Sequence, residues 1–249
     1  DGVNIDSEDV AMQVMDDFGY ELVMQYDPSA DLKRGDIYKE YPGTSTDKIV
    51  EALIERFSLP IEAIKTEYNL GDIADDKVAE VLADRITIAT NEAFETKLNA
   101  IPGISEALVQ IDKQLGGIEN RALCTTSRQD RMDISLERAV DPETGKNASL
   151  AELFPAEDNR RFSGYEHDNK YAAVLPLLGW DPAETVVVED SLSGVTKAKA
   201  ASPDFRVIGT VAAKFYEDKH AQASALRNAG ADIVITDIRD LPAALAWLD

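Results

Sequence analysis

The pattern of apolar and polar positions divides the chain into two regions. From about residue 8 to 98 the spacing predicts helices throughout. The apolar residues between Ile49 and Phe57 fall on one face of a helix that ends near Pro60. A second long amphipathic helix is predicted from about residue 75 to 98, and it stops at the breaker Ile101–Gly103.

After Gly103 short apolar strands alternate with helices. The predicted strands lie at 121–125, 185–188, 206–211 and 232–235, and the predicted helices at 104–115, 128–139, 194–201, 219–229 and 241–248. This alternation predicts an α/β fold with a doubly wound parallel sheet. Ligands bind outside the carboxyl ends of such strands. The residues to examine are therefore Thr125–Ser127 and Glu189–Ser191.

The charge of the chain narrows its possible partners. The 249 residues suffice for one core domain and a smaller insert, and they carry 47 acidic against 25 basic side chains, a net charge of −22. Such a surface repels nucleic acid and anionic lipid, so we expect neither as a partner. No run of 18 apolar residues indicates a membrane helix. The acidity is typical of ordinary solubility, with a saline habitat as the alternative.

Two observations bear on the cellular compartment. Cys124 is the single cysteine, so the chain cannot form an intrachain disulfide. The first twenty residues carry several carboxylates and no apolar signal region. Both fit a cytoplasmic protein.

The strongest motif is Val186–Gly194, in which three valines precede Glu189 and Asp190. Burying carboxylates is costly unless they meet a cation or hydrogen-bond donors. Carboxylate oxygens suit Mg²⁺, particularly beside a phosphate. An acidic N-cap of the next helix is the alternative, and the motif alone favours neither.

Two further motifs could bind an anion. Thr125, Thr126 and Ser127 end a predicted strand at the head of a helix, where hydroxyl and backbone N–H groups can cradle phosphate. In isolation a plain N-cap explains these three residues better. Lys170 lies in the first turn of a helix, where its charge opposes the helix dipole. Alone, it would be a solvated surface lysine.

Together with the opening Asp1–Glu8, these motifs resemble, in order and spacing, the four motifs of the haloacid dehalogenase-like hydrolase superfamily. The resemblance covers nearly the whole chain. It implies a Rossmann-like core with an inserted all-helical cap, as in the phosphoglycolate phosphatase and β-phosphoglucomutase group. The core is expected at 1–8 and 100–249 and the cap at 9–99.

The first motif of that family is an apolar strand followed by Asp-x-Asp-Gly-Val. Asp1, Gly2 and Val3 match its second half. The nucleophilic Asp is therefore expected two positions before Asp1, together with the strand that precedes it, because losing a central strand would expose sheet edges. The alternative is a degenerate, noncatalytic member. At the third motif relatives often have Gly-Lys-Pro, whereas this chain has Asn169, Lys170 and Tyr171.

The resemblance assigns a role to each motif. It implies that Asp1 is the general acid and base and that Thr125 and Lys170 hold the transferring phosphoryl group. Mg²⁺ is expected on Glu189, Asp190 and the backbone carbonyl of Asp1. The further substrate- and phosphate-binding residues are expected to be Gly2, Thr126, Ser127, Gly43 and Thr44, the last two from the cap segment Tyr41–Ser45.

The function expected from this resemblance is Mg²⁺-dependent hydrolysis of a small phosphorylated metabolite through an aspartyl-phosphate. The alternatives are a β-phosphoglucomutase-like phosphotransferase and a noncatalytic protein of the same fold. Asp1 favours a phosphatase over a dehalogenase, because a phosphate ester leaves as an alkoxide that needs a proton. The protein is expected to be a monomer or a homodimer.

Overall fold

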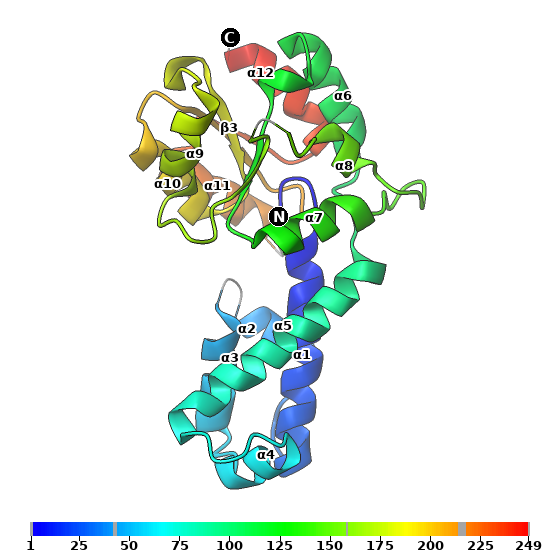
Figure 1. The fold of residues 1–249 in the computed structure, drawn as a ribbon, viewed down its shortest axis with the longest axis vertical. Helices are drawn as coiled ribbons and strands as arrows, with labels where there is room; N and C mark the ends of the chain where they lie inside the picture. Colours follow the sequence, from blue (N-terminus) through cyan, green and yellow to red (C-terminus); the bar gives the residue numbers. More distant parts are fainter. Residues whose placement is uncertain (1, 42–43, 158, 214–217, 249) are drawn as a thin grey trace. The chain divides into compact units, whose positions relative to one another are not determined.

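The chain folds into two compact units (Figure 1). The computed structural model describes residues 2–41, 44–157, 159–213 and 218–248. One unit comprises residues 9–94, and the other comprises residues 1–8 together with 95–249. No helix in the described ranges is long and apolar enough to cross a bilayer.

The unit of residues 9–94 is helical. Its elements are α1 (Ser7–Tyr26), α2 (Asp36–Glu40), α3 (Thr46–Arg56), α4 (Ile61–Glu67), a short 3-10 turn (Asp75–Lys77) and α5 (Val78–Lys97). The predicted apolar face of α3 is confirmed, because Ile49, Val50 and Leu53 are at most 1% exposed. They pack in one cluster with side chains of α1 and α5, including Leu22 and Leu82.

Within this unit Asp16 of α1 anchors the start of α2. Its buried carboxylate accepts hydrogen bonds from the backbone N–H groups of Gly35 (2.6 Å), Ile37 (3.1 Å) and Tyr38 (3.3 Å). The Tyr38 hydroxyl donates to Asp9 Oδ1 at 2.7 Å. The charge of Asp16 thus meets the unpaired N–H groups that begin a helix.

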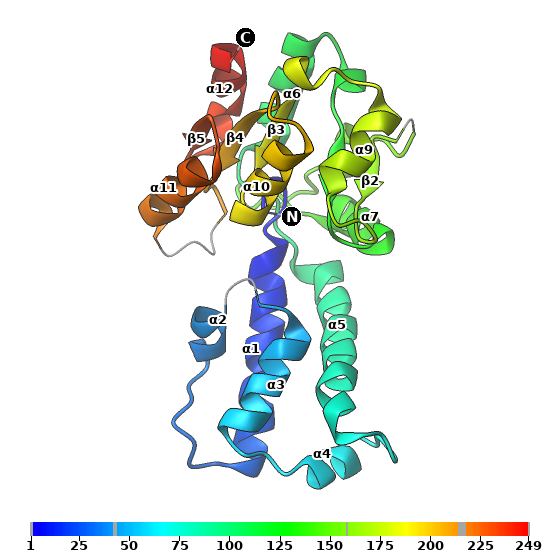
Figure 2. The same ribbon diagram turned by 90° about the vertical axis from the view of Figure 1, so that its left-hand side faces the viewer.

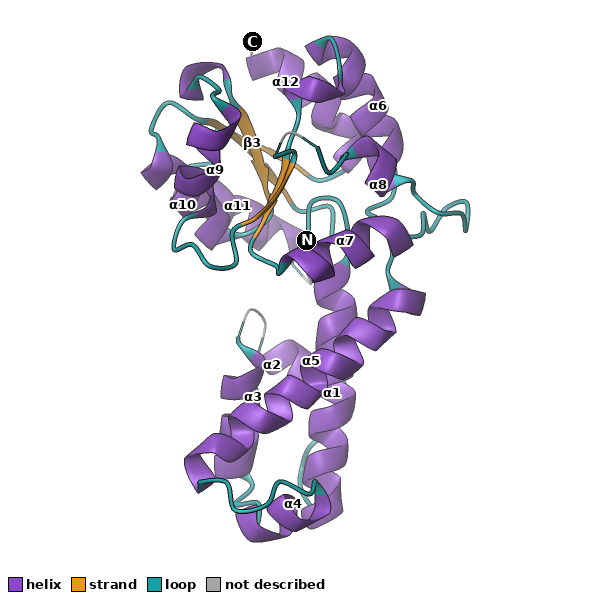
Figure 3. Cartoon of the chain, viewed as in Figure 1, coloured by secondary structure: helices purple, strands orange, loops and turns teal. Residues whose placement is uncertain are grey.

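The second unit alternates helices and strands. Its strands are β1 (Leu123–Thr125), β2 (Arg161–Ser163), β3 (Val186–Glu189), β4 (Arg206–Thr210) and β5 (Ile233–Ile235). Its α-helices are α6 (Ile104–Leu115), α7 (Gln129–Arg138), α8 (Leu150–Leu153), α9 (Lys170–Leu178), α10 (Leu192–Ala201), α11 (Lys219–Ala229) and α12 (Leu241–Leu248). Helices lie on both sides of the strands (Figure 3), so the predicted α/β class is confirmed.

All strand pairs are parallel, but the described strands form two sheets rather than one. β1 pairs with β2, so that Leu123 lies opposite Arg161 and Thr125 opposite Ser163. β3, β4 and β5 form the second sheet in that order (Figure 2). Its core contains Val187 and Val207 with Val195 of α10 and Leu226 of α11.

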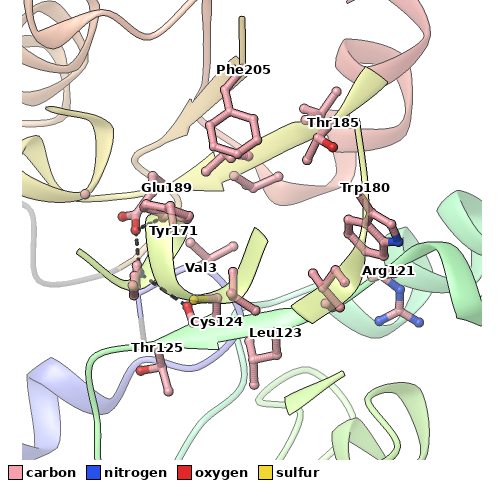
Figure 4. A pocket seen from close by; sticks show the side chains of 18 of the residues that line it. Val3, Arg121, Leu123, Cys124, Thr125, Tyr171, Trp180, Thr185, Glu189 and Phe205 are labelled. Carbon is pink, nitrogen blue, oxygen red and sulfur yellow. Dashed lines mark hydrogen bonds and ion pairs between the residues drawn. The ribbon is translucent and has the colours of Figure 1, made fainter. Parts of the chain in front are cut away.

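A cavity of about 1010 Å³ lies along the edges of β1 and β3 (Figure 4). It is lined by Leu123–Thr125 and by Val186–Glu189. Within the described part of the chain, β1 pairs with β2 alone and β3 with β4 alone. Each of the two strands therefore has one edge without a neighbouring strand there.

Candidate active site

Two polar side chains mark the carboxyl ends of the strands that flank the cavity. Thr125 is the last residue of β1 and Glu189 the last residue of β3. Both are buried, with 6% and 3% exposed, and both line the cavity. Since ligands bind at this end of parallel strands, the sequence-predicted residues lie where a substrate would be received.

Glu189 is held by donors on both carboxylate oxygens. Its Oε1 lies 2.6 Å from Lys170 Nζ and accepts a hydrogen bond from the Tyr171 hydroxyl. Its Oε2 accepts from the N–H groups of Asp190 and Ser191 and from the Ser191 hydroxyl, at 3.2, 3.4 and 3.3 Å. Burial opposes ionisation, but the Lys170 charge and these hydrogen bonds hold the pKa of Glu189 below its usual value. The carboxylate is therefore charged at neutral pH.

Lys170 connects the ends of the two strands. Helix α9 begins at this residue because the Asn169 side chain accepts from the N–H groups of Tyr171 (3.0 Å) and Ala172 (3.3 Å). The ammonium group contacts Glu189 at the end of β3 and donates to the Cys124 carbonyl of β1 at 3.2 Å. This lysine, whose charge opposes the dipole of its own helix, thus lies at the cavity, and its side chain is 12% exposed.

Gly164 makes room for this lysine. A Cβ at Gly164 would lie 2.4 Å from Lys170 Cβ, so a larger residue would displace it. The Gly164 N–H also donates to the Thr125 carbonyl at 2.7 Å. Neither Gly164 nor Tyr171 was predicted as a site residue. In the sequence, only the position of Tyr171 directly after Lys170 could have indicated that it lies at the site.

The surroundings of Asp190 disfavour the ionised form of its carboxyl group. Burial raises the pKa of its carboxyl to about 6, and the charge of Glu189 adds to the effect. A Cβ at Gly2 would lie 1.7 Å from Asp190 Oδ2, so only glycine leaves space for this carboxylate. Gly2 also has φ +69°, which favours glycine in its own right.

The hydroxyl residues after β1 form a turn. Thr125 Oγ1 accepts from the Ser127 N–H at 3.1 Å, and Ser163 Oγ donates to the Ser127 carbonyl at 2.7 Å. A hydroxyl that accepts such a bond can still donate its own proton to a phosphate oxygen. Thr126 is exposed and lines the cavity, whereas Ser127 is half-buried.

Three further residues were predicted to belong to the site. Asp1 and Gly43 fall outside the described residues. Thr44 is exposed in the helical unit, where its N–H donates to the Tyr41 carbonyl at 3.2 Å. Its predicted contact with substrate stays a prediction.

The residues at the ends of the strands suit a hard divalent cation. Glu189 and Asp190 offer carboxylate oxygens, and the raised pKa of Asp190 means that its ionised form gains stability from a nearby cation. The described residues alone form no group of three His, Cys, Asp or Glu side chains that could hold a metal.

Comparisons with known proteins agree with this reading of the fold. No family model matches the chain. β-Phosphoglucomutases of Mycobacterium bovis and Mycobacterium tuberculosis are each 26% identical over 179 residues, which is 72% of this chain and 59% of theirs. The chain thus spans less than two thirds of the length of these curated relatives.

Solved structures extend the likeness over the whole chain. A haloacid dehalogenase (HAD) family hydrolase of Deinococcus radiodurans R1, solved with bound phosphate and sodium, is 23% identical with a TM-score of 0.64, covering 100% of this chain and 93% of its own. A putative β-phosphoglucomutase of Thermotoga maritima is 22% identical with a TM-score of 0.65, covering 99% and 95%. A predicted phosphoglycolate phosphatase of Haemophilus somnus is 14% identical with a TM-score of 0.62, covering 98% and 94%. The chain therefore has the fold of the haloacid dehalogenase-like hydrolases, a Rossmann-like core with a helical cap, and the resemblance predicted from its motifs is confirmed.

Proposed function

We propose that the protein is an Mg²⁺-dependent phosphatase that hydrolyses a small phosphorylated metabolite, such as a sugar phosphate or a phosphoglycolate-like compound. The observation that carries this proposal is the position of Lys170, whose ammonium group contacts Glu189 at 2.6 Å and the Cys124 carbonyl at 3.2 Å. A chain of net charge −22 repels a phosphate dianion, so this buried cation is placed where it offsets the repulsion. The likeness to phosphatases and phosphomutases supports phosphoryl-transfer chemistry.

In this proposal the Thr125 hydroxyl and the Lys170 ammonium bind the oxygens of the transferring phosphoryl group, and the Thr126 N–H is a further donor. Asp1 protonates the leaving oxygen and then activates water for the second step. Asp190, together with the Asp1 carbonyl, would hold Mg²⁺, and Glu189 would act through a bound water. When bound, the metal neutralises charge on the phosphoryl oxygens.

The proposal places the nucleophilic carboxylate two positions before Asp1, where it would form the aspartyl-phosphate. The cavity between β1 and β3 supports this, because a strand entering it would pair with the open edges of both. A cytoplasmic location and a monomeric or homodimeric state stay predictions.

A β-phosphoglucomutase-like phosphotransferase is the second candidate, because the curated relatives bear that name. One experiment separates the two. The protein, expressed with any codons that precede Asp1 in its gene, is incubated with Mg²⁺ and a panel of phosphorylated sugars and phosphoglycolate. Free phosphate that disappears with EDTA and in Asp190→Asn supports the phosphatase. Isomerisation that needs a bisphosphate primer and releases little phosphate supports the mutase. An unreactive protein with a residue other than Asp two positions before Asp1 contradicts both.

A further inference from the structure

One side chain at the site has no counterpart in the predicted machinery. Tyr171 follows Lys170 directly in α9, at the position where the related motif often has proline. Its side chain is buried, 6% exposed, and lines the same cavity. Its hydroxyl donates to Glu189 Oε1, the oxygen that also contacts Lys170 (Figure 4).

The ring of Tyr171 is fixed independently of this hydrogen bond. It packs against Phe205 with centroids 6.4 Å apart and an interplanar angle of 67°. It also lies in the core cluster with Val187 and Val195. The Lys170 ammonium lies 4.9 Å from the ring centroid. The phenol is therefore held by core packing as well as by the carboxylate that it contacts.

The Glu189 side chain has little other freedom. A Cβ at Gly194 would lie 2.1 Å from Glu189 Cδ, so helix α10 closes off one side of the carboxylate. Three donors from Asp190 and Ser191 hold Oε2. Tyr171 and Lys170 share Oε1. Of these two donors to Oε1, the Tyr171 phenol is neutral and the Lys170 ammonium is charged. The phenol therefore orients the carboxylate without adding charge to the site.

We propose that Tyr171 is a positioning residue that orients the Glu189 carboxylate and, through it, aims the Lys170 ammonium at the phosphoryl group. The proposal rests on the function proposed above. Without the hydroxyl, Oε1 would be free to turn toward Lys170 alone, and the ammonium would shift from the strand ends. Such a shift lowers the rate of transfer more than substrate affinity, because charge on the phosphoryl oxygens must be met at defined positions.

Tyr171→Phe tests this, because it keeps the ring and removes only the hydroxyl. The matched control is Tyr38→Phe, which removes a phenol–carboxylate hydrogen bond to Asp9 in the helical unit. We expect Tyr171→Phe to lower kcat by roughly 10-fold or more, the range expected when a hydrogen bond to a charged group is lost. KM and the affinity for inorganic phosphate, measured by calorimetry, should both stay within about twofold of the wild type. The control should match the wild type in all three.

Crystal structures of the wild type and Tyr171→Phe give a readout that needs no activity. The proposal expects the Glu189 carboxylate and Lys170 Nζ to move in the variant. Unchanged positions of both, or unchanged kcat with only a loss of stability, would show that Tyr171 is a core residue and overturn the proposal. If the wild type releases and binds no phosphate but the pair moves in the variant, the proposed function fails while the positioning of Glu189 by Tyr171 stands.

Discussion

Lys170 and Glu189 form an ion pair of 2.6 Å in which the two side chains are only 12% and 4% exposed. Desolvating both charges costs several kcal/mol. A pair of well-packed apolar residues at these positions would therefore stabilise the fold about as well. The value of the ion pair lies in keeping an ammonium group at the ends of β1 and β3.

Replacing Lys170 by Met should destabilise the protein strongly. It leaves the Glu189 charge buried without its cation, which costs roughly 3–5 kcal/mol. Lys170→Met combined with Glu189→Gln should recover much of that loss, while phosphatase activity stays absent. Urea unfolding measures both. The control is Lys77→Met, which breaks a surface ion pair with Glu80 whose side chains are 59% and 62% exposed, and it should cost about 1 kcal/mol or less. A Lys170→Met protein as stable as this control would contradict the prediction.

Asp190 should make the metal-free protein less stable as pH rises. Its pKa is raised from 3.8 to about 6, so the folded state holds the proton more tightly than the unfolded state. The stability due to protonated Asp190 is complete below pH 4 and is lost as pH rises through about 6. The full loss is on the order of 3 kcal/mol. Asp190→Asn in EDTA should therefore match the wild type at pH 4 and exceed its free energy of unfolding at pH 7.

Adding Mg²⁺ at pH 7 should make the wild type more stable than Asp190→Asn. A cation bound to the ionised Asp190 stabilises the folded wild type but not the variant. Thermal unfolding at pH 7 with and without Mg²⁺ is the measurement. Equal stabilisation of both proteins by Mg²⁺ would place the metal elsewhere.

Gly2→Ala should remove activity through a steric effect on Asp190. A Cβ there would lie 1.7 Å from Asp190 Oδ2, at a φ of +69°. Gly145→Ala separates the two causes, because Gly145 has φ +67° and nothing within 4 Å of an added Cβ. Both changes should cost roughly 1–2 kcal/mol for the left-handed backbone. The loss of Mg²⁺ binding and turnover should appear in Gly2→Ala alone, so retained turnover there refutes the close approach.

The Cys124 thiol should be almost inert in the folded protein. Burial raises its pKa from 9.0 to about 12, so the thiolate fraction at pH 8 falls about a thousandfold. Reaction with a thiol-specific disulfide reagent should be slow in native buffer and fast in guanidinium chloride. Comparable rates in the two conditions would show that the thiol is accessible and ionised.

Much of the fold could be read from the spacing of apolar residues. Helices α6 and α11 begin and end where they were predicted, β3 begins and ends one residue later than predicted, and β4 ends one residue earlier. The strand β2 was missed because Arg161, Phe162 and Ser163 give neither an alternating nor a β-branched pattern. It becomes a strand only by pairing with β1, which is a tertiary effect.

The residues of the candidate site could be predicted from the sequence only through the order and spacing of the motifs. The ion pair joins Lys170 to Glu189, which lies far along the chain, and no local pattern predicts such a pair. The contact between Tyr171 and Glu189 spans 18 positions and depends on where tertiary packing places the start of α9. Such contacts follow from three-dimensional packing, so a pattern of single residues cannot reveal them.

The arrangement of the strands also determines which strands open by local fluctuations and which open only when the whole unit unfolds. β4 has strands on both edges, and its residues from Val207 to Thr210 are buried, whereas β1 borders the cavity. Amide protons of β4 should therefore exchange with solvent only on global unfolding, and those of β1 through small, frequent fluctuations. Thr125, which would bind the phosphoryl group, thus belongs to a strand that opens more readily than β4, and a bound ligand would slow the exchange of its amide protons.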